Sequence, residues 1–256
     1  MNLIKPKHLS PGDTIATVSP SWGCAGDYDT NWRYLLGKER LEKIFGLKVV
    51  AAPNSMRGES YLSENPEARA EDIIWAFQNK SVNAIIANIG GNDSIKLLPH
   101  IDKSIISNNP KIFVGYSDIL NLHLLCYKAN ISSFYGPNLL PNIAEPQGLH
   151  KYTCEWFSKV FFDNGPIGTI PPSQNWTCDQ NSYIDKHRIR KYHSNKGYNL
   201  IQGAGKIQGR LFGGQTGMMT LSGTSIELSI NTFLYPLPFQ RGYYFSLYLL
   251  SQLLVL

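Results

Sequence analysis

A serine on a short polar turn is the first residue of this sequence with the setting for chemistry. Ser117 stands in "GYSD", between the apolar run 111–116 and the helical pattern 118–129. A strand that ends in a sharp turn and passes directly into a helix is the setting of a nucleophile elbow, which raises a serine hydroxyl above a sheet. Ile119 replaces the second glycine of the usual Gly-x-Ser-x-Gly pattern, so an ordinary helix N-cap is the alternative role for this serine.

Two backbone segments near this turn could stabilise negative charge. The N–H of Asp118 would open the next helix, where N–H groups lack intrahelical acceptors and the dipole favours anions. A second donor would come from the loop at Gly90 and Gly91, which follows another apolar run. That loop lacks the Lys-Ser/Thr ending of a Walker loop and the spaced glycines of a dinucleotide fingerprint. A plain tight turn is the alternative.

A serine nucleophile also needs a general base, which is usually a histidine held by a carboxylate. His123 lies six positions along the expected helix from Ser117, so its side chain should point away from the serine. The other histidines stand in loop-like, terminal or basic segments: His8, His100, His150, His187 and His193. No histidine is therefore predicted as the base.

Aromatic residues in a Pro- and Asn-rich stretch are candidates for ligand binding. Trp176 and Tyr183 could stack on a planar group, with Lys186, Arg188 and Arg190 close by in the sequence for an anion. The alternative is that these aromatic side chains anchor a long loop to the surface of a domain.

The elements that would position these residues alternate along the first 140 residues. Continuously apolar runs predict buried strands, and runs with helical spacing separate them. The expected strands are 14–19, 47–52, 82–89 and 111–116, and the expected helices are 31–45, 65–79 and 118–129. This order predicts an α/β fold with a doubly wound parallel sheet of the flavodoxin-like kind. The loops 19–23, 88–94 and 115–118 should then meet at one edge of the sheet.

Composition excludes several classes of protein. A hydrophobic content of 43% suits a globular chain. The net charge is +5, and the sequence contains no block of basic residues that would bind nucleic acid. The four cysteines form no metal or redox motif, and the first residues lack the apolar run of a signal peptide. We therefore expect a cytoplasmic protein without metal or membrane attachment.

Residue composition and pattern divide the chain into three parts. Residues 1–164 would form the domain with Ser117, 165–204 a connecting loop or lid, and 205–256 an incomplete C-terminal α/β domain. From Phe233 onward Arg241 is the single charged residue, and prolines interrupt this apolar tail, so it does not predict a membrane anchor.

Five ordered motifs resemble the LD-carboxypeptidase family of serine peptidases. They are "PGDTIATVSPS", "NIGGNDSIKLLPHID", "NPKIFVGYSDI", "FYGPNLLP" and "GKIQGRLFGGQTGMMTLSGT". The spacing through "NWTCDQNSYIDKHRIRKYH" is most similar to the microcin C immunity branch. The resemblance implies a two-domain hydrolase without cofactor, commonly a homodimer. Its substrate would be a small peptide or peptidyl-nucleotide, either muramoyl tetrapeptide or a processed microcin C-type aminoacyl-nucleotide.

The resemblance also implies roles for single residues. Ser117 would be the nucleophile, and the backbone of Asp118 and Gly91 would form the oxyanion hole. Gly90, Trp176 and Tyr183 would contact the substrate.

The family's catalytic Glu and His belong to its second domain, and no acidic pair follows the expected strand 231–235 in this sequence. We therefore expect a change of reading frame near Tyr235. The alternative function is a catalytically impaired relative that only binds ligand, because a general base typically supplies about 10²–10⁴-fold in rate. A nucleotide-binding doubly wound domain is a third hypothesis.

Overall fold

The computed structural model describes residues 3–179, 182–201, 203–206, 208–209 and 213–214. The predicted C-terminal domain at 205–256 therefore lies outside the described residues, apart from isolated positions before residue 215, and so does the expected change of frame near Tyr235. The domain boundaries at 164 and 204 stay predictions.

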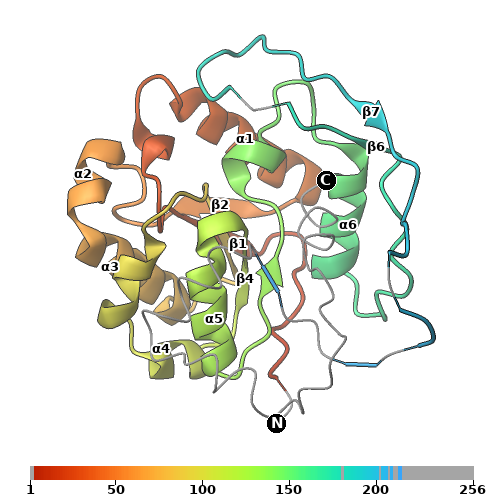
Figure 1. Cartoon of the computed structure of the whole chain (residues 1–256). Coiled ribbons are helices and arrows are strands. Elements are labelled where there is room, and N and C mark those ends of the chain that lie inside the picture. Colours follow the sequence, from red (N-terminus) through yellow and green to blue (C-terminus); the bar gives the residue numbers. More distant parts are fainter. Residues whose placement is uncertain (1–2, 180–181, 202, 207, 210–212, 215–256) are drawn as a thin grey trace.

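A five-stranded parallel sheet forms the centre of the described structure (Figure 1). Its strand order is β2-β1-β3-β4-β5, which is the flavodoxin-like order of a doubly wound sheet. The strands are β1 (Thr14–Val18), β2 (Lys48–Ala51), β3 (Ala84–Ala87), β4 (Ile112–Gly115) and β5 (Phe134–Tyr135). The four strands expected from the sequence are thus confirmed, together with the predicted fold class. The two-residue strand β5 was not predicted.

Helices cover both faces of the sheet, because successive strand side chains point to opposite faces. Ile15, Ile86 and Val114 pack in the cluster that contains α1 (Asn31–Phe45) and α6 (Lys151–Phe161). Val18, Ile85 and Phe113 pack in the cluster that contains α3 (Pro66–Gln78), α4 (Lys103–Ser107) and α5 (Leu120–Lys128). Both faces are therefore buried, as the continuous apolar runs indicated.

Local signals explain where the long helices begin and end. Gly46 has φ 67° and ends α1 in the left-handed conformation that glycine adopts without strain. Pro66 is the first residue of α3, where its missing N–H costs no hydrogen bond. The sequence did not predict the short helix α2 (Glu59–Glu64), α4 or α6.

The predicted connecting loop contains some regular structure. Strands β6 (Asn175–Trp176) and β7 (His193–Ser194) pair antiparallel as a short ribbon beside α6 (Figure 1). Within the described residues, no helix combines the length and the apolar character needed to cross a bilayer.

One buried carboxyl on α3 makes the stability of the fold depend on pH. Asp72 is 2% exposed, and its Oδ1 accepts hydrogen bonds from the N–H and the Nδ2 of Asn54. Its Oδ2 has no partner among the described residues. Burial raises the pKa of Asp72 to about 6, so the folded state holds a proton that the unfolded state releases near pH 4.

We predict that stability falls as pH rises from about 4 through about 6, and that Asp72→Asn removes this part of the slope. The Asn variant should be more stable than the parent at pH 8 by about 2 to 3 kcal/mol, since one pKa unit corresponds to about 1.4 kcal/mol. Urea unfolding at pH 4.5 and pH 8 measures both values. Exposed Glu64, changed to Gln, is the control, and an unchanged slope in Asp72→Asn would contradict the prediction.

Candidate active site

Three loops meet at the carboxyl edge of the sheet, as the sequence predicts. They follow β1, β3 and β4, which are neighbours in the sheet. The N–H of Trp22 donates to the carbonyl oxygen of Gly90 at 3.1 Å, which joins the first two loops. A Cβ atom added to Gly90 would lie 2.9 Å from the Cβ of Ser117, so the second and third loops also touch. The helix that follows β1 covers one face of the sheet, and the helix that follows β3 covers the other. Doubly wound sheets bind ligands at such a switch point between neighbouring strands.

Ser117 has a strained backbone. Its φ is 68°, and among the described residues Asn130 is the one other non-glycine residue with positive φ. Tyr116 before it is extended, and Ser117 opens a 3-10 turn, Ser117–Ile119, that leads into α5. No side chain caps this turn or α5, so the structure does not give Ser117 the N-cap role. A non-glycine residue in this region costs energy and marks functional turns, among them the nucleophile elbow.

The side chain of Asp118 connects the serine turn to the other two loops. It is fully buried, and its Oδ2 accepts hydrogen bonds from the Oγ of Ser21 at 2.6 Å and the N–H of Ser94 at 2.7 Å. The Oγ of Ser94 donates to the backbone carbonyl of Asp118 at 2.6 Å. Asn121 Nδ2 approaches Oδ1 at 3.3 Å. The sequence predicted a role only for the N–H of Asp118 and missed its carboxylate.

An ion pair between a buried arginine and a half-buried aspartate holds the same loops from the side of α3. Arg69 is 1% exposed, and its guanidinium donates to both carboxylate oxygens of Asp93, at 2.7 and 3.0 Å. It also donates to the carbonyl oxygens of Pro20 and Ser21. Burial alone would raise the pKa of Asp93, but Arg69 and Lys96 together outweigh it and leave that pKa lowered. The pair therefore fixes the loop after β1 to the glycine loop.

The two glycines of the second loop stand where no side chain fits. A Cβ on Gly91 would lie 2.1 Å from the Oγ of Ser21, and one on Gly90 would meet Ser117. Within the described part of the chain, the N–H of Gly91 has no hydrogen-bond acceptor. The close approach of the backbone to Ser117 goes beyond what a plain tight turn requires.

His123 does not face the serine, as its spacing predicted. Its Nε2 lies 2.9 Å from the carbonyl oxygen of Gly115 and its Nδ1 2.9 Å from the Oγ of Ser133. Burial lowers the pKa of His123 to about 4, so the ring is neutral and supports the end of β4. Among the described residues, no side chain bonds to the hydroxyl of Ser117.

The structure separates the two aromatic candidates. Tyr183 lies edge-on to Trp22 with ring centres 5.6 Å apart, so it reaches the loop after β1. Trp176 belongs to β6, where its ring lies 5.0 Å from that of His193. Of the basic residues expected to hold an anion, Arg190 pairs instead with the carboxylate of Glu145. Tyr183 thus lies near the serine turn, whereas Trp176 packs within the ribbon.

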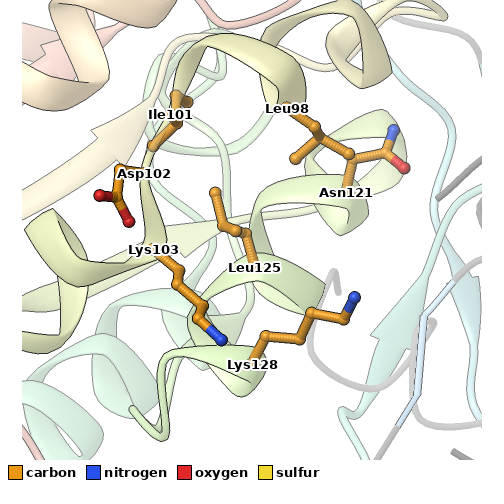
Figure 2. A pocket seen from close by; sticks show the side chains of 7 residues that line it. All are labelled: Leu98, Ile101, Asp102, Lys103, Asn121, Leu125 and Lys128. Atoms are coloured by element: carbon orange, nitrogen blue, oxygen red, sulfur yellow. The ribbon is translucent and has the colours of Figure 1, made fainter. Parts of the chain in front are cut away.

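A cavity of about 320 Å³ lies between the segment 98–103 and α5. Figure 2 shows the side chains that line it, among them the apolar Leu98, Ile101 and Leu125 and the charged Lys103 and Lys128. Ser117 does not line this cavity. The strained serine and the glycine backbone thus lie outside this cavity.

Neither a metal-ligand cluster nor a reactive buried thiol is found in the described residues. They contain no group of three or more His, Cys, Asp or Glu side chains placed to hold a metal ion. Cys24 and Cys126 are buried, and burial raises the pKa of each thiol to about 12, which leaves them unreactive.

The chain is similar in sequence and in fold to known proteins. The model of the LD-carboxypeptidase N-terminal domain matches residues 15–136. The microcin C7 self-immunity protein MccF of Escherichia coli is 30% identical over 214 residues, which are 83% of this chain and 61% of MccF. A probable murein peptide carboxypeptidase of Bacillus subtilis (strain 168) is 32% identical over 158 residues, 61% of this chain and 47% of the relative. The crystal structure of an MccF-like protein from Streptococcus pneumoniae in complex with AMP matches with a TM-score of 0.76 at 30% identity, covering 89% of this chain and 68% of that one.

The flavodoxin-like sheet with a strained serine turn at its carboxyl edge defines a doubly wound α/β protein. More particularly, the chain belongs to the LD-carboxypeptidase family of serine peptidases. It spans 61% of the length of MccF and 47% of the length of the Bacillus carboxypeptidase.

The close contact between Gly90 and Ser117 predicts that Gly90→Ala destabilises the protein by about 1 to 3 kcal/mol, the usual range for overpacking. Gly165→Ala is the matched control, because a Cβ at Gly165 meets nothing within 4 Å. Urea unfolding of both variants measures the difference. Equal stability of the two variants would show that the serine turn tolerates a methyl group at Gly90.

We predict that Asp118→Asn lowers the stability of the fold. Donors face both carboxylate oxygens of Asp118, so in either orientation the amide NH₂ of an asparagine would face a donor. We expect a loss of about 1 to 3 kcal/mol, the cost of an unsatisfied buried polar group. Exposed Asp163, changed to Asn, should leave stability unchanged. Thermal unfolding at pH 7 compares the two, and an Asp118→Asn variant as stable as the control would contradict the network.

Proposed function

We propose that this chain carries the nucleophile of a serine hydrolase that cleaves an amide bond next to a terminal residue. The single observation behind the proposal is the backbone of Ser117, with φ 68° at the end of β4 and the Gly90 backbone packed against its side chain. Such a turn exposes the hydroxyl beside backbone donors, which is what attack on a carbonyl needs.

In this proposal, the Oγ of Ser117 attacks the substrate carbonyl carbon while its proton passes to a general base. The carbonyl oxygen becomes an anion, which the N–H groups of Asp118 and Gly91 stabilise, while Gly90 leaves room for the substrate. The tetrahedral intermediate expels the amine, which takes the proton, and water then hydrolyses the acyl-enzyme. The resemblance assigns the base to a Glu and His of the second domain, which the described residues do not include.

Two substrate classes fit this reaction. One is a processed microcin C-type aminoacyl-nucleotide, supported by the likeness to MccF and to the MccF-like protein in complex with AMP. Tyr183 beside Trp22 supplies aromatic surface near the serine turn for a base to stack on. Any contact of Trp176 with the substrate would come from the ribbon of β6 and β7. The other class is muramoyl tetrapeptide, supported by the murein peptide carboxypeptidase.

The setting of the proposed enzyme follows from the resemblance and the sequence pattern. We place the protein in the cytoplasm, as a homodimer like its family, and without metal or organic cofactor. Its partners would be small substrates and not nucleic acid.

We predict that Ser117→Ala lowers turnover at least about 10³-fold, because the covalent step is lost. The assay incubates purified chain with muramoyl tetrapeptide and, separately, with an aminoacyl-nucleotide phosphoramidate, and follows the released products by mass spectrometry. Ser158→Ala, at a position of similar partial exposure on α6, should keep full activity.

Three other outcomes separate the hypotheses. Equal turnover by the parent and Ser117→Ala would refute the nucleophile role. Binding of either substrate by the parent without any product would favour the impaired, ligand-binding relative. Tight AMP binding that Ser117→Ala does not alter, again without turnover, would favour the nucleotide-binding domain.

A further inference from the structure

A buried charge cluster lies outside the proposed reaction centre, at Glu145. This residue is 3% exposed and follows the π-helical turn Leu139–Ile143. Its Oε2 lies 2.8 Å from the guanidinium of Arg190 and 4.0 Å from that of Arg33. An exposed ion pair contributes little, but a buried carboxylate is costly to leave without its partners.

On one side of the cluster, two arginines of α1 bond to the backbone around Glu145. Arg33 on α1 donates from Nε to the carbonyl oxygen of Leu140 at 2.7 Å. Arg40, also on α1, donates to the carbonyl oxygens of Ile143 and Glu145 at 2.7 and 2.6 Å. The carboxylate of Glu145 therefore has a fixed position over α1.

The other side of the cluster is the segment 182–191, which Figure 1 shows as part of the cyan chain passing close to α1. Arg190 donates from Nε to the carbonyl oxygen of Asp179 at 3.1 Å, and the N–H of Lys191 donates to the Asp179 carboxylate at 2.7 Å. At the other end of the segment, Arg33 donates to the carbonyl oxygen of Ser182. The segment is thus bonded to α1 at Ser182 and to Glu145 at Arg190.

This segment reaches the candidate active site through Tyr183. Its carbonyl oxygen accepts from the Nε1 of Trp32 at 3.1 Å, and its ring centre lies 4.9 Å from the guanidinium carbon of Arg33. Its edge contacts Trp22, whose N–H bonds to Gly90. Burial raises the pKa of Tyr116, the residue before Ser117, and the charge of Tyr183 raises it further.

We propose that Glu145 is a positioning residue which, through Arg190, fixes the segment 182–191 against α1, so that Tyr183 forms a permanent wall of the substrate site. That Tyr183 faces a substrate rests on the proposed function of Ser117, whereas the anchoring of the segment does not. A preset wall lowers the entropy that a ligand must otherwise remove on binding. The expected consequence lies in ligand affinity, while the chemical step at Ser117 is unaffected.

Hydrogen exchange and ligand titration test this proposal with Arg190→Gln. This variant leaves Glu145 next to Arg33, so the fold retains a charged partner for the buried carboxylate. We expect amide exchange in 182–191 to rise at least about tenfold while β3 is unchanged, because local opening follows local stability. We also expect AMP to bind about tenfold more weakly, and KM for the aminoacyl-nucleotide to rise with kcat retained. Lys191→Gln is the matched control, since it removes the neighbouring charge without touching Glu145.

Glu145→Gln keeps the size of the side chain and removes its charge, and it should free the segment in the same way. In the double variant the two effects should not add, because both remove one interaction. Unchanged exchange in Arg190→Gln would overturn the anchor. Faster exchange with unchanged AMP affinity and KM would overturn the positioning role. If the parent cleaves neither substrate, the proposed function fails, while the exchange comparison still decides whether Arg190 fixes the segment.

Discussion

The buried carboxylate of Asp118 is the interaction on which the arrangement of the site depends. It accepts hydrogen bonds from Ser21 after β1 and from Ser94 at the end of the glycine loop, and it belongs to the serine turn itself. Three segments that are far apart in the chain are thereby held to one point. A charged acceptor that satisfies several donors in a dry environment is stronger than neutral hydrogen bonds, and losing any partner is costly. The position of each loop therefore depends on the other two.

This constraint explains how a strained serine persists. A positive φ at Ser117 is unfavourable by about 1 to 2 kcal/mol for a residue with a Cβ atom, so the surroundings must enforce it. The N–H of Ser117 donates to the hydroxyl of Tyr135, and His123 bonds to the carbonyl oxygen of Gly115. Together with the Asp118 contacts, these bonds hold the backbone on both sides of the turn. Buried side chains thus position the backbone groups that the proposed chemistry would use.

The sequence allowed much of the fold to be predicted, because the information is local. Continuous apolar runs identified four strands, and their alternation with helices predicted a doubly wound parallel sheet. The "GYSD" turn and the glycine loop were also recognisable from residue type and setting. The carboxylate network was not, because Ser21 and Asp118 are 97 positions apart and nothing local pairs them. Glu145 was missed for the same reason, since its partners on α1 and in the segment 182–191 are brought together only by folding.

The central claim is that Ser117 can form a tetrahedral adduct whose oxygen lies between the N–H groups of Asp118 and Gly91. Addition of a peptide boronic acid to ¹⁵N-labelled protein tests it most directly, because boron bonds to an active serine Oγ and leaves a negatively charged, oxyanion-like oxygen. The account predicts that the amide signals of Asp118 and Gly91 shift downfield together with saturation, and that neither shifts in Ser117→Ala. Adduct formation that leaves these two amides unmoved, or shifts that persist without the serine, would contradict it.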